Sequence, residues 1–377
     1  MALNSKMRVT HVLYSGLGGH SAVLFSLLRG GLLRTDQHSI IFAGVEPPPP
    51  DYLRQCDELK IDNLYIPKAL GKGNLKFQYQ IFRRLADLNT NILFVHGLAA
   101  TPAIVLLKAL CIGRRKTFVL LRETQANDLK SRREWLMLAI AHQFADRIVH
   151  LTEEAAQGAA LYLGKLVRSQ KVGIIPNGLD VDFYSPAPNS RSVDGTIHIG
   201  MQSRLQSNKD HPTLIKAFAL IRDRHPSKSF HLHIGGDGST YEAIKQMIDA
   251  YGLGKVVTLH GMLDQANLRA LLQRLDIYVH CTHGETMSTA LMQAISCGLP
   301  VIASNVAGVN NMILPNLGLL YAPGDENDLV KKIDGLVLNP LMADRFRECA
   351  RSYALKNYSV ANIVKSYEKL IGENVLQ

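Results

Sequence analysis

Two cations, Arg204 and Lys209, lie in the segment SRLQSNKDH, directly after a predicted strand. Cations five residues apart at the carboxyl end of a strand can clamp two phosphate groups, Arg through its planar guanidinium and Lys as a point charge. A solvated surface pair is the competing interpretation. The position favours an anion site, because ligands of parallel α/β sheets bind beyond the carboxyl ends of the strands.

A second polar group lies in the segment THGETMSTALMQAISCGLPVIAS. Glu285 precedes a helix that we expect to begin near Thr286. Apolar residues at helical spacing predict that one face of this helix packs on a sheet. Thr289, Gln293 and Ser296 form a polar stripe on another face. The pattern therefore predicts a helix that is scaffold on one side and binding site on the other.

The start of this helix is expected to offer unpaired backbone amides at Met287, Ser288 and Thr289. A diphosphate there would be held by these amides and the helix dipole, together with Arg204 and Lys209.

The two remaining polar groups of this segment are then placed to contact hydroxyl groups of such a ligand. Glu285 can accept hydrogen bonds from a hydroxyl-rich ligand, and Gln293 can reach a ribose. The alternative is that Glu285 only complements the helix dipole.

Glycine-rich turns follow two other predicted strands. In SGLGGHS, Gly16, Gly18 and Gly19 would let the backbone approach an anion, although Ser21 occupies the third glycine position of a dinucleotide fingerprint. A tight strand-to-helix turn explains the same glycines. In GGDGS, Asp237 and Ser239 are expected to cap the next helix rather than to contact a ligand.

Short apolar runs alternate with helical patterns almost throughout the chain, which predicts βαβ units and two doubly wound parallel sheets. The stretch IIPNGLDVDFYSPAPNSRSVDG, rich in Pro, Gly, Asn and Asp, separates them. We expect an N-terminal domain over 1–176, a linker over 177–194, a C-terminal domain over 195–358 and a last helix over 359–377 that joins the N-terminal domain. Two such domains predict a binding cleft.

Positive charge is concentrated in the first half of the chain. Residues 1–176 carry 23 Lys and Arg against 13 Asp and Glu, and the remainder carries 19 against 19. Ordinary surface charge or an anionic partner explains this excess. No nucleic-acid-binding signature is present, so we expect no such partner. The segment KGNLKFQYQIFRRLADL is either a basic amphipathic helix that lies on an anionic membrane or a helix that packs inward.

Five scattered cysteines without CxxC spacing argue against a disulfide framework and a zinc site. The N-terminal residues lack the apolar region of a secretory signal, and no apolar run is long enough to cross a bilayer. These features predict a cytoplasmic protein, with peripheral contact to the inner face of the cell membrane as an option.

Taken in order, several segments resemble the retaining glycosyltransferases of family 4, which have two Rossmann domains in the GT-B fold. The segments are GLGGHS, VGIIPNGLDVDFYSP, SRLQSNKDHPTLIKAFALI, IGGDGS, GETMSTALMQAISCGLPVIAS and GLLYAPGD, and they span nearly the whole chain. The resemblance implies transfer of a sugar from a nucleotide diphosphate donor to an acceptor hydroxyl, with retained configuration and without a metal or cofactor.

The resemblance also implies roles for individual residues. Arg204 and Lys209 would neutralise the diphosphate, and Glu285 matches the first acid of the family's E-x7-E motif, which contacts hydroxyls of the donor sugar. Gly19 matches the loop glycine near the phosphates, and His96, in FVHG, matches a histidine on the acceptor side. A structural histidine at a strand end is the alternative for His96.

Three positions depart from the family pattern. Gln293 replaces the second acid, a ribose ligand, so charge-assisted hydrogen bonding to the ribose is lost. The small residues after the first acid are replaced by Thr-Met-Ser, which alters the donor-sugar pocket. Arg122 and Glu123 stand where many members have a histidine, and are candidates to contact donor or acceptor.

The sequence therefore predicts a glycosyltransferase that uses a nucleotide sugar, with UDP as the expected nucleotide and GDP next. The expected acceptor is a glycan or a lipid-linked molecule, in bacterial surface polysaccharide or lipopolysaccharide synthesis. Two alternatives remain: a nucleotide-sugar epimerase of GT-B fold, and a nucleotide-sugar-binding protein without catalysis.

Overall fold

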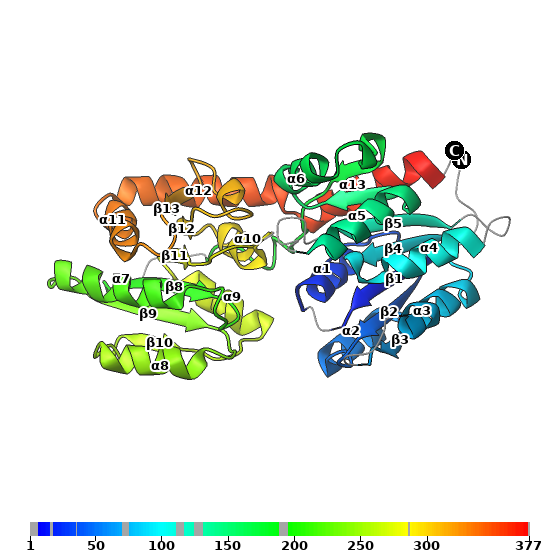
Figure 1. The fold of residues 1–377 in the computed structure, drawn as a ribbon. Coiled ribbons are helices and arrows are strands. Elements are labelled where there is room, and N and C mark those ends of the chain that lie inside the picture. Colours follow the sequence, from blue (N-terminus) through cyan, green and yellow to red (C-terminus); the bar gives the residue numbers. More distant parts are fainter. Residues whose placement is uncertain are drawn as a thin grey trace. The chain divides into compact units, whose positions relative to one another are not determined.

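The computed structural model describes residues 7–15, 18–34, 36–69, 75–110, 117–123, 131–187, 195–285 and 287–375. The chain divides into two compact units. Unit 1 comprises Met1–Gly178 and Val360–Gln377, and unit 2 comprises Leu179–Ser359. Each unit is a parallel sheet with helices on both faces, as the colouring of Figure 1 allows the reader to follow.

Unit 1 contains a seven-stranded sheet in the order β3-β2-β1-β4-β5-β6-β7, with every pair parallel. Its elements are β1 (Arg8–Tyr14), α1 (Gly18–Arg29), β2 (Gln37–Gly44), α2 (Pro50–Leu59), β3 (Asp62–Pro67), α3 (Leu75–Asp87), β4 (Ile92–His96), η1 (Leu98–Ala100), α4 (Thr101–Leu110), β5 (Phe118–Glu123), α5 (Arg132–Phe144), β6 (Arg147–His150), α6 (Glu153–Leu163), η3 (Gly164–Leu166), η4 (Ser169–Lys171), β7 (Val172–Ile174) and α13 (Val360–Val375).

The strands of unit 1 bury both faces, because successive side chains point to opposite sides of a sheet. Val9 packs toward α1 and α13, whereas Val12 packs toward α3 and α4. Helix α13, drawn in red in Figure 1, comes from the far end of the chain and contacts α1.

Unit 2 contains a six-stranded parallel sheet in the order β10-β9-β8-β11-β12-β13. Its elements are β8 (Ile197–Gln202), α7 (His211–Arg224), β9 (Phe230–Gly235), α8 (Tyr241–Ala250), β10 (Val257–Leu259), α9 (Gln265–Arg274), β11 (Ile277–His280), α10 (Thr289–Ser296), β12 (Val301–Ser304), η5 (Asn310–Met312), β13 (Gly318–Tyr321), α11 (Glu326–Val337) and α12 (Pro340–Asn357).

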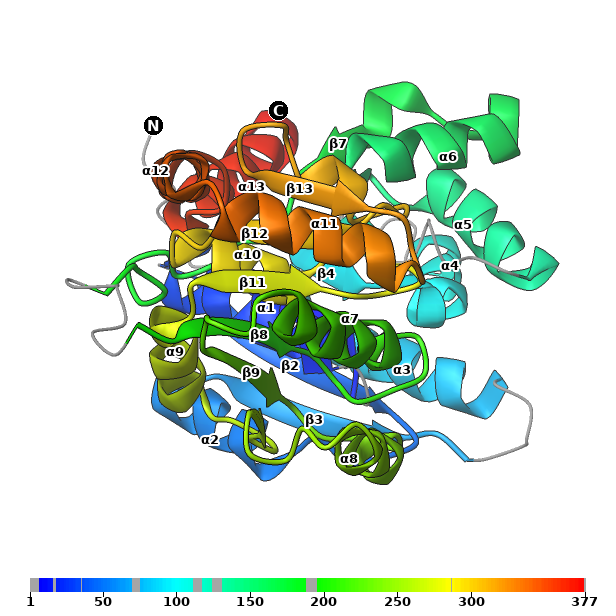
Figure 2. The same cartoon turned by 90° about the vertical axis from the view of Figure 1, so that its left-hand side faces the viewer.

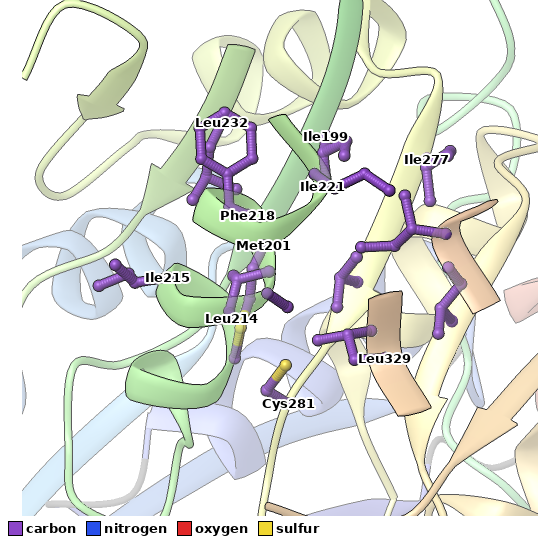
Figure 3. Packing of buried hydrophobic residues seen from close by; sticks show 14 of the residues in the cluster. Ile199, Met201, Leu214, Ile215, Phe218, Ile221, Leu232, Ile277, Cys281 and Leu329 are labelled. Atoms are coloured by element: carbon purple, nitrogen blue, oxygen red, sulfur yellow. The ribbon is translucent and has the colours of Figure 1, made fainter. Parts of the chain in front are cut away.

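One core of unit 2 lies between its sheet and helices α7, α8 and α11. Figure 3 shows Phe218 of α7 beside Leu232 of β9, with Ile199 of β8 close by. A second core lies on the opposite face, under α9, α10 and α12. Figure 2 shows the same layers from the side. Two doubly wound parallel sheets are therefore present, which confirms the predicted fold class.

The segment predicted as a linker, 177–194, is in part a structural element of unit 2. Leu179, Val181 and Tyr184 are buried in the core with α9, α10 and α12. The amide of Leu179 donates to the carbonyl oxygen of Tyr358 at 2.8 Å. The Pro, Gly and Asp content suggested a linker, but three apolar side chains find a core in the folded unit. Residues 188–194 lie outside the described residues.

Helix α3 was predicted as either a membrane-surface helix or an inward-packing one. Its apolar residues Phe77, Ile81 and Leu85 are buried against the sheet of unit 1. These three side chains thus belong to the core, whereas Leu75 and Tyr79 of the same helix are exposed. No helix among the described residues combines the length and the apolar content that crossing a bilayer requires.

Histidines form a hydrogen-bonded row on one face of β8, β9 and the end of β10. His233 is buried, and its two ring nitrogens lie 3.0 Å from ring nitrogens of His198 and His260. Burial, followed by the nearby histidines and Arg274, lowers the pKa of His233 to about 3. His233, the central residue of the row, is therefore neutral near pH 7.

This pKa predicts acid sensitivity. Below pH 6.5, His233 binds a proton in the unfolded chain but not in the folded one. Its contribution to the free energy of unfolding is therefore fully present above that pH and decreases as the pH falls toward 3. Between pH 7 and pH 5 this residue accounts for a loss of about 2 kcal/mol. The free energy of urea unfolding of His233→Gln should fall less than that of wild type over this range. An equal fall in both proteins would contradict the assignment.

Candidate functional site

The candidate site lies at the carboxyl ends of β8 and β11 in unit 2. The chain order reverses between these two neighbouring strands, which is where ligands of doubly wound sheets bind. The loop after β8 carries Arg204 and Lys209, and the loop after β11 carries Glu285. The fold thus brings together three of the predicted site residues.

Glu285 is the centre of the site. One carboxylate oxygen accepts a hydrogen bond from the Nζ of Lys209, and the other lies 2.8 Å from Nε2 of His280. His280 is the last residue of β11 and is fully buried, and Lys209 is only 8% exposed. A buried cation next to a carboxylate forms a charge pair that water screens weakly.

The same contacts set the charge of the carboxyl group. Burial raises the pKa of Glu285, but the charges and hydrogen bonds of His280 and Lys209 outweigh burial and hold it well below its usual range. Glu285 is therefore an ionised acceptor. Each oxygen has a further lone pair that can accept a hydrogen bond from a ligand hydroxyl.

Buried hydrogen bonds fix the loop that carries Glu285. The amide of Thr282 donates to Oγ of Ser304 at 2.9 Å, and the hydroxyl of Thr282 donates to the carbonyl oxygen of Asn208 at 3.0 Å. Ser304 is in turn 3.0 Å from the hydroxyl of Tyr321. The loops after β8, β11 and β12 are thus tied to one another below the charged groups.

The glycine-rich loop after β9 supports the loop that carries Arg204. A Cβ atom on Gly236, where φ is +128°, would lie 1.8 Å from the carbonyl oxygen of Ser203. Only glycine permits this approach. The expected capping role of Asp237 and Ser239 is wrong, because Thr240 precedes α8 and makes no side-chain cap. Asp237 instead accepts a hydrogen bond from the amide of Gly238.

Arg204 differs from Lys209 in its surroundings. It is exposed, and no ion pair joins it to another described residue. Lys209 is paired with Glu285. Arg204 has no such partner in the described part of the chain, so it is the more available of the two cations for binding an anion. A diphosphate at this edge would form charge-assisted hydrogen bonds with its guanidinium.

Helix α10 starts later than the sequence suggested. It begins at Thr289, with Ser288 as the N-cap whose hydroxyl accepts from the amide of Leu291, and Thr286 lies outside the described residues. The amide of Ser288 donates to Sδ of Met312 at 3.4 Å. Ser288 is thus not one of the free amide donors that were predicted, because its amide faces the protein interior.

The polar stripe of α10 is only partly open. Ser296 is fully buried, whereas Thr289 and Gln293 are half-buried. Gln293 forms a hydrogen bond with the buried Tyr184, which comes from the segment predicted as a linker. The glutamine thus has a partner inside unit 2, and its contact with a ribose stays a prediction.

Unit 1 places its predicted residues at different depths. Gly19 lies in the first turn of α1, and His96 ends β4, buried with its ring beside those of His11 and Phe94. These two sites flank the reversal in strand order between β1 and β4. Gly16 lies outside the described residues.

Arg122 ends up inside unit 1 rather than on its surface. It is 1% exposed and donates from Nη2 to Oδ1 of Asn177. As it stands, this side chain anchors the end of β5 to the segment that leaves unit 1. Glu123 is the last residue of β5, and its side chain lies outside what the structure describes.

His280 was missed by the sequence analysis. The signal was present in DIYVHCTHGE, where a histidine ends a predicted strand five residues before the glutamate.

Among the described residues, no group of His, Cys, Asp and Glu side chains is arranged to hold a metal ion.

The pair between Lys209 and Glu285 can be tested through stability. In a double-mutant cycle with Lys209→Met and Glu285→Gln, the free energy of urea unfolding should show a coupling of about 1–3 kcal/mol, because each change leaves the other group buried without its partner. Additive effects of the two substitutions would show that the pair contributes nothing.

Comparisons with known proteins agree with this geometry. Residues 188–353, which hold Arg204, Lys209 and Glu285, match the family described as Glycosyl transferases group 1. The gpi3 subunit of phosphatidylinositol N-acetylglucosaminyltransferase from Schizosaccharomyces pombe is 30% identical over 219 residues, which are 57% of this chain and 47% of that protein.

A D-inositol 3-phosphate glycosyltransferase from Arthrobacter sp. (strain FB24) is 29% identical over 178 residues, which are 45% of this chain and 42% of that protein. The matches thus span less than half the length of these two relatives.

The crystal structure of HepE from Anabaena in complex with UDP superposes with a TM-score of 0.79 at 18% identity, covering 97% of this chain and 100% of that one. This likeness concerns the fold. Residues 188–353 thus match the group 1 glycosyltransferases, and the chain as a whole has the GT-B fold of two parallel-sheet units.

Proposed function

We propose that the protein transfers a sugar from a UDP-sugar to a phosphate-bearing acceptor, with unit 2 holding the donor. The observation that carries the proposal is the ionised Glu285 held by Lys209 and His280, with the exposed Arg204 on the same loop as Lys209. This arrangement offers cations to a diphosphate and a fixed acceptor to sugar hydroxyls at one sheet edge.

The chemistry of the transfer explains this distribution of charge. When the bond from the sugar to UDP breaks, negative charge develops on the leaving diphosphate while the sugar becomes electron-poor. Arg204 would stabilise the diphosphate, and Lys209 would share its charge between Glu285 and the phosphates. Preorganised charges of this kind stabilise a transition state without reorganisation during the reaction. Glu285 would orient the sugar through its hydroxyls.

Three further residues belong to this proposed donor site. Met287 and Thr289 line the start of α10, and Gln293 lies one turn further along. Retention of configuration and independence from metal follow from the resemblance to family 4 and form part of the proposal. The role of His96 on the acceptor side also follows from this resemblance and is part of the proposal.

An inositol phosphate, free or in a phospholipid, is the acceptor that two observations favour. The names of the two relatives refer to phosphatidylinositol and to D-inositol 3-phosphate. The excess of positive charge lies in residues 1–176, which belong to unit 1. Surface polysaccharide or lipopolysaccharide synthesis, the pathway predicted from the sequence, has no counterpart in these two names.

Nucleotide binding tests the donor site. Calorimetry with UDP should give an affinity that falls about tenfold to a hundredfold in Arg204→Ala, the range expected for loss of a hydrogen bond to a charged group. Arg345→Ala removes an equally exposed arginine from α12 and should bind UDP as wild type does. Equal affinity of all three proteins would place the nucleotide elsewhere.

Transfer itself requires a second assay. With a panel of UDP-sugars and either inositol 3-phosphate or unphosphorylated inositol, we expect a glycosylated product from the phosphate only, because unit 1 supplies cations to bind it. Binding of UDP without product from any acceptor would indicate a non-catalytic sugar-nucleotide-binding protein. Donor turnover without acceptor would indicate an epimerase or a hydrolase.

A further inference from the structure

Unit 1 exposes a group of large apolar side chains along α5, α6 and η3, which we name the α5/α6 corner. Its exposed fractions are 56% for Leu136, 36% for Phe144, 90% for Leu161, 58% for Tyr162 and 51% for Leu166. Single exposed leucines are common on protein surfaces, but a group on adjoining elements marks an interaction surface. Helices α5 and α6 lie side by side in Figures 1 and 2.

The corner is positively charged as well as apolar. Lys165 and Arg168 are exposed on the segment that follows α6. No acidic residue occurs between Glu154 and Asp180. Glu134 at the start of α5 adjoins the exposed Arg132 and Arg133. Glu154 lies in the first turn of α6, at the opposite end of that helix from Leu161. The partner of this surface should therefore be both apolar and anionic.

The corner is also held in a defined shape. The ring of Trp135 on α5 stacks on Tyr162 with centroids 4.0 Å apart. At the other end of α5, Gln143 donates to the carbonyl oxygen of Leu166 and accepts from Arg168 at 2.8 Å. The exposed side chains are thus presented by a fixed backbone.

We propose that the α5/α6 corner docks on an anionic phospholipid bilayer. Leucines that enter the acyl region and cations that meet lipid phosphates are the two contributions that hold an interfacial segment on a membrane. Tyrosine and tryptophan favour the boundary between the headgroups and the hydrocarbon. A bilayer with anionic headgroups supplies the apolar and the negative component in one surface, and the inference does not depend on the donor site.

Helix α3, the segment that the sequence suggested for this role, is less suited to it. Its residues Phe77, Ile81 and Leu85 already pack against the sheet. The corner exposes five large apolar side chains, whereas α3 exposes two, Leu75 and Tyr79. The structure therefore moves the candidate membrane contact from α3 to the end of α6.

Trp135 is the only tryptophan of the chain, so its fluorescence reports on this corner alone. The full chain would be mixed with vesicles of phosphatidylcholine, with or without phosphatidylglycerol. We expect a blue shift of the emission, together with cosedimentation that requires phosphatidylglycerol and weakens as salt is added. Leu161→Ser/Leu166→Ser should lower the partition coefficient about tenfold or more.

Three variants complete the experiment. Lys165→Glu/Arg168→Glu should lose the preference for anionic vesicles, whereas the control Leu338→Ser/Leu341→Ser, which changes two exposed leucines of unit 2, should bind as wild type does. Circular dichroism would verify that each variant is folded. The proposal is overturned if wild type does not bind anionic vesicles or if Leu161→Ser/Leu166→Ser binds equally well. It is also overturned if Lys76→Glu/Arg83→Glu on α3 abolishes binding while the corner variants retain it.

Discussion

Burial of the Lys209 ammonium beside the carboxylate of Glu285 is the constraint on which the candidate site depends. A cation that is only 8% exposed requires an anionic partner, and the two residues come from loops after different strands. Both loops must therefore adopt one mutual arrangement. The hydrogen bonds of Thr282 to Asn208 and Ser304 hold that arrangement from below. The position of α10 follows from it, since the helix begins four residues after Glu285.

Buried histidines solve a related problem in unit 2. A parallel sheet that is covered on both faces has few places for polar side chains, and a polar group buried there needs a partner. His198, His233 and His260 provide partners for one another across neighbouring strands. The lowered pKa of His233 means that this central imidazole is neutral in the folded unit, so acid destabilises the arrangement. The stability that these hydrogen-bonded histidines give to unit 2 therefore depends on pH.

The two units divide the charge of the chain between them. Unit 2 pairs its buried Lys209 with the carboxylate of Glu285, whereas the excess of positive charge lies in residues assigned to unit 1. The amphipathic sequence pattern of α3 did not predict which part of unit 1 exposes the most apolar side chains. Most of the apolar stripe of α3 packs into the core, with Leu75 and Tyr79 left exposed, whereas the α5/α6 corner exposes five large apolar side chains. Periodicity reports that a face is apolar, and packing decides what covers it.

The sequence by itself determined the alternation of strands and helices, the two parallel sheets and the location of Arg204, Lys209 and Glu285 at strand ends. These features are local, because periodicity and turn residues act over a few positions. Only the tertiary structure decided that Lys209 and Glu285 pair across 76 residues of chain, that His280 joins them, and that Arg122 is buried. The reason is that burial and pairing depend on which distant strands become neighbours, which no local pattern encodes.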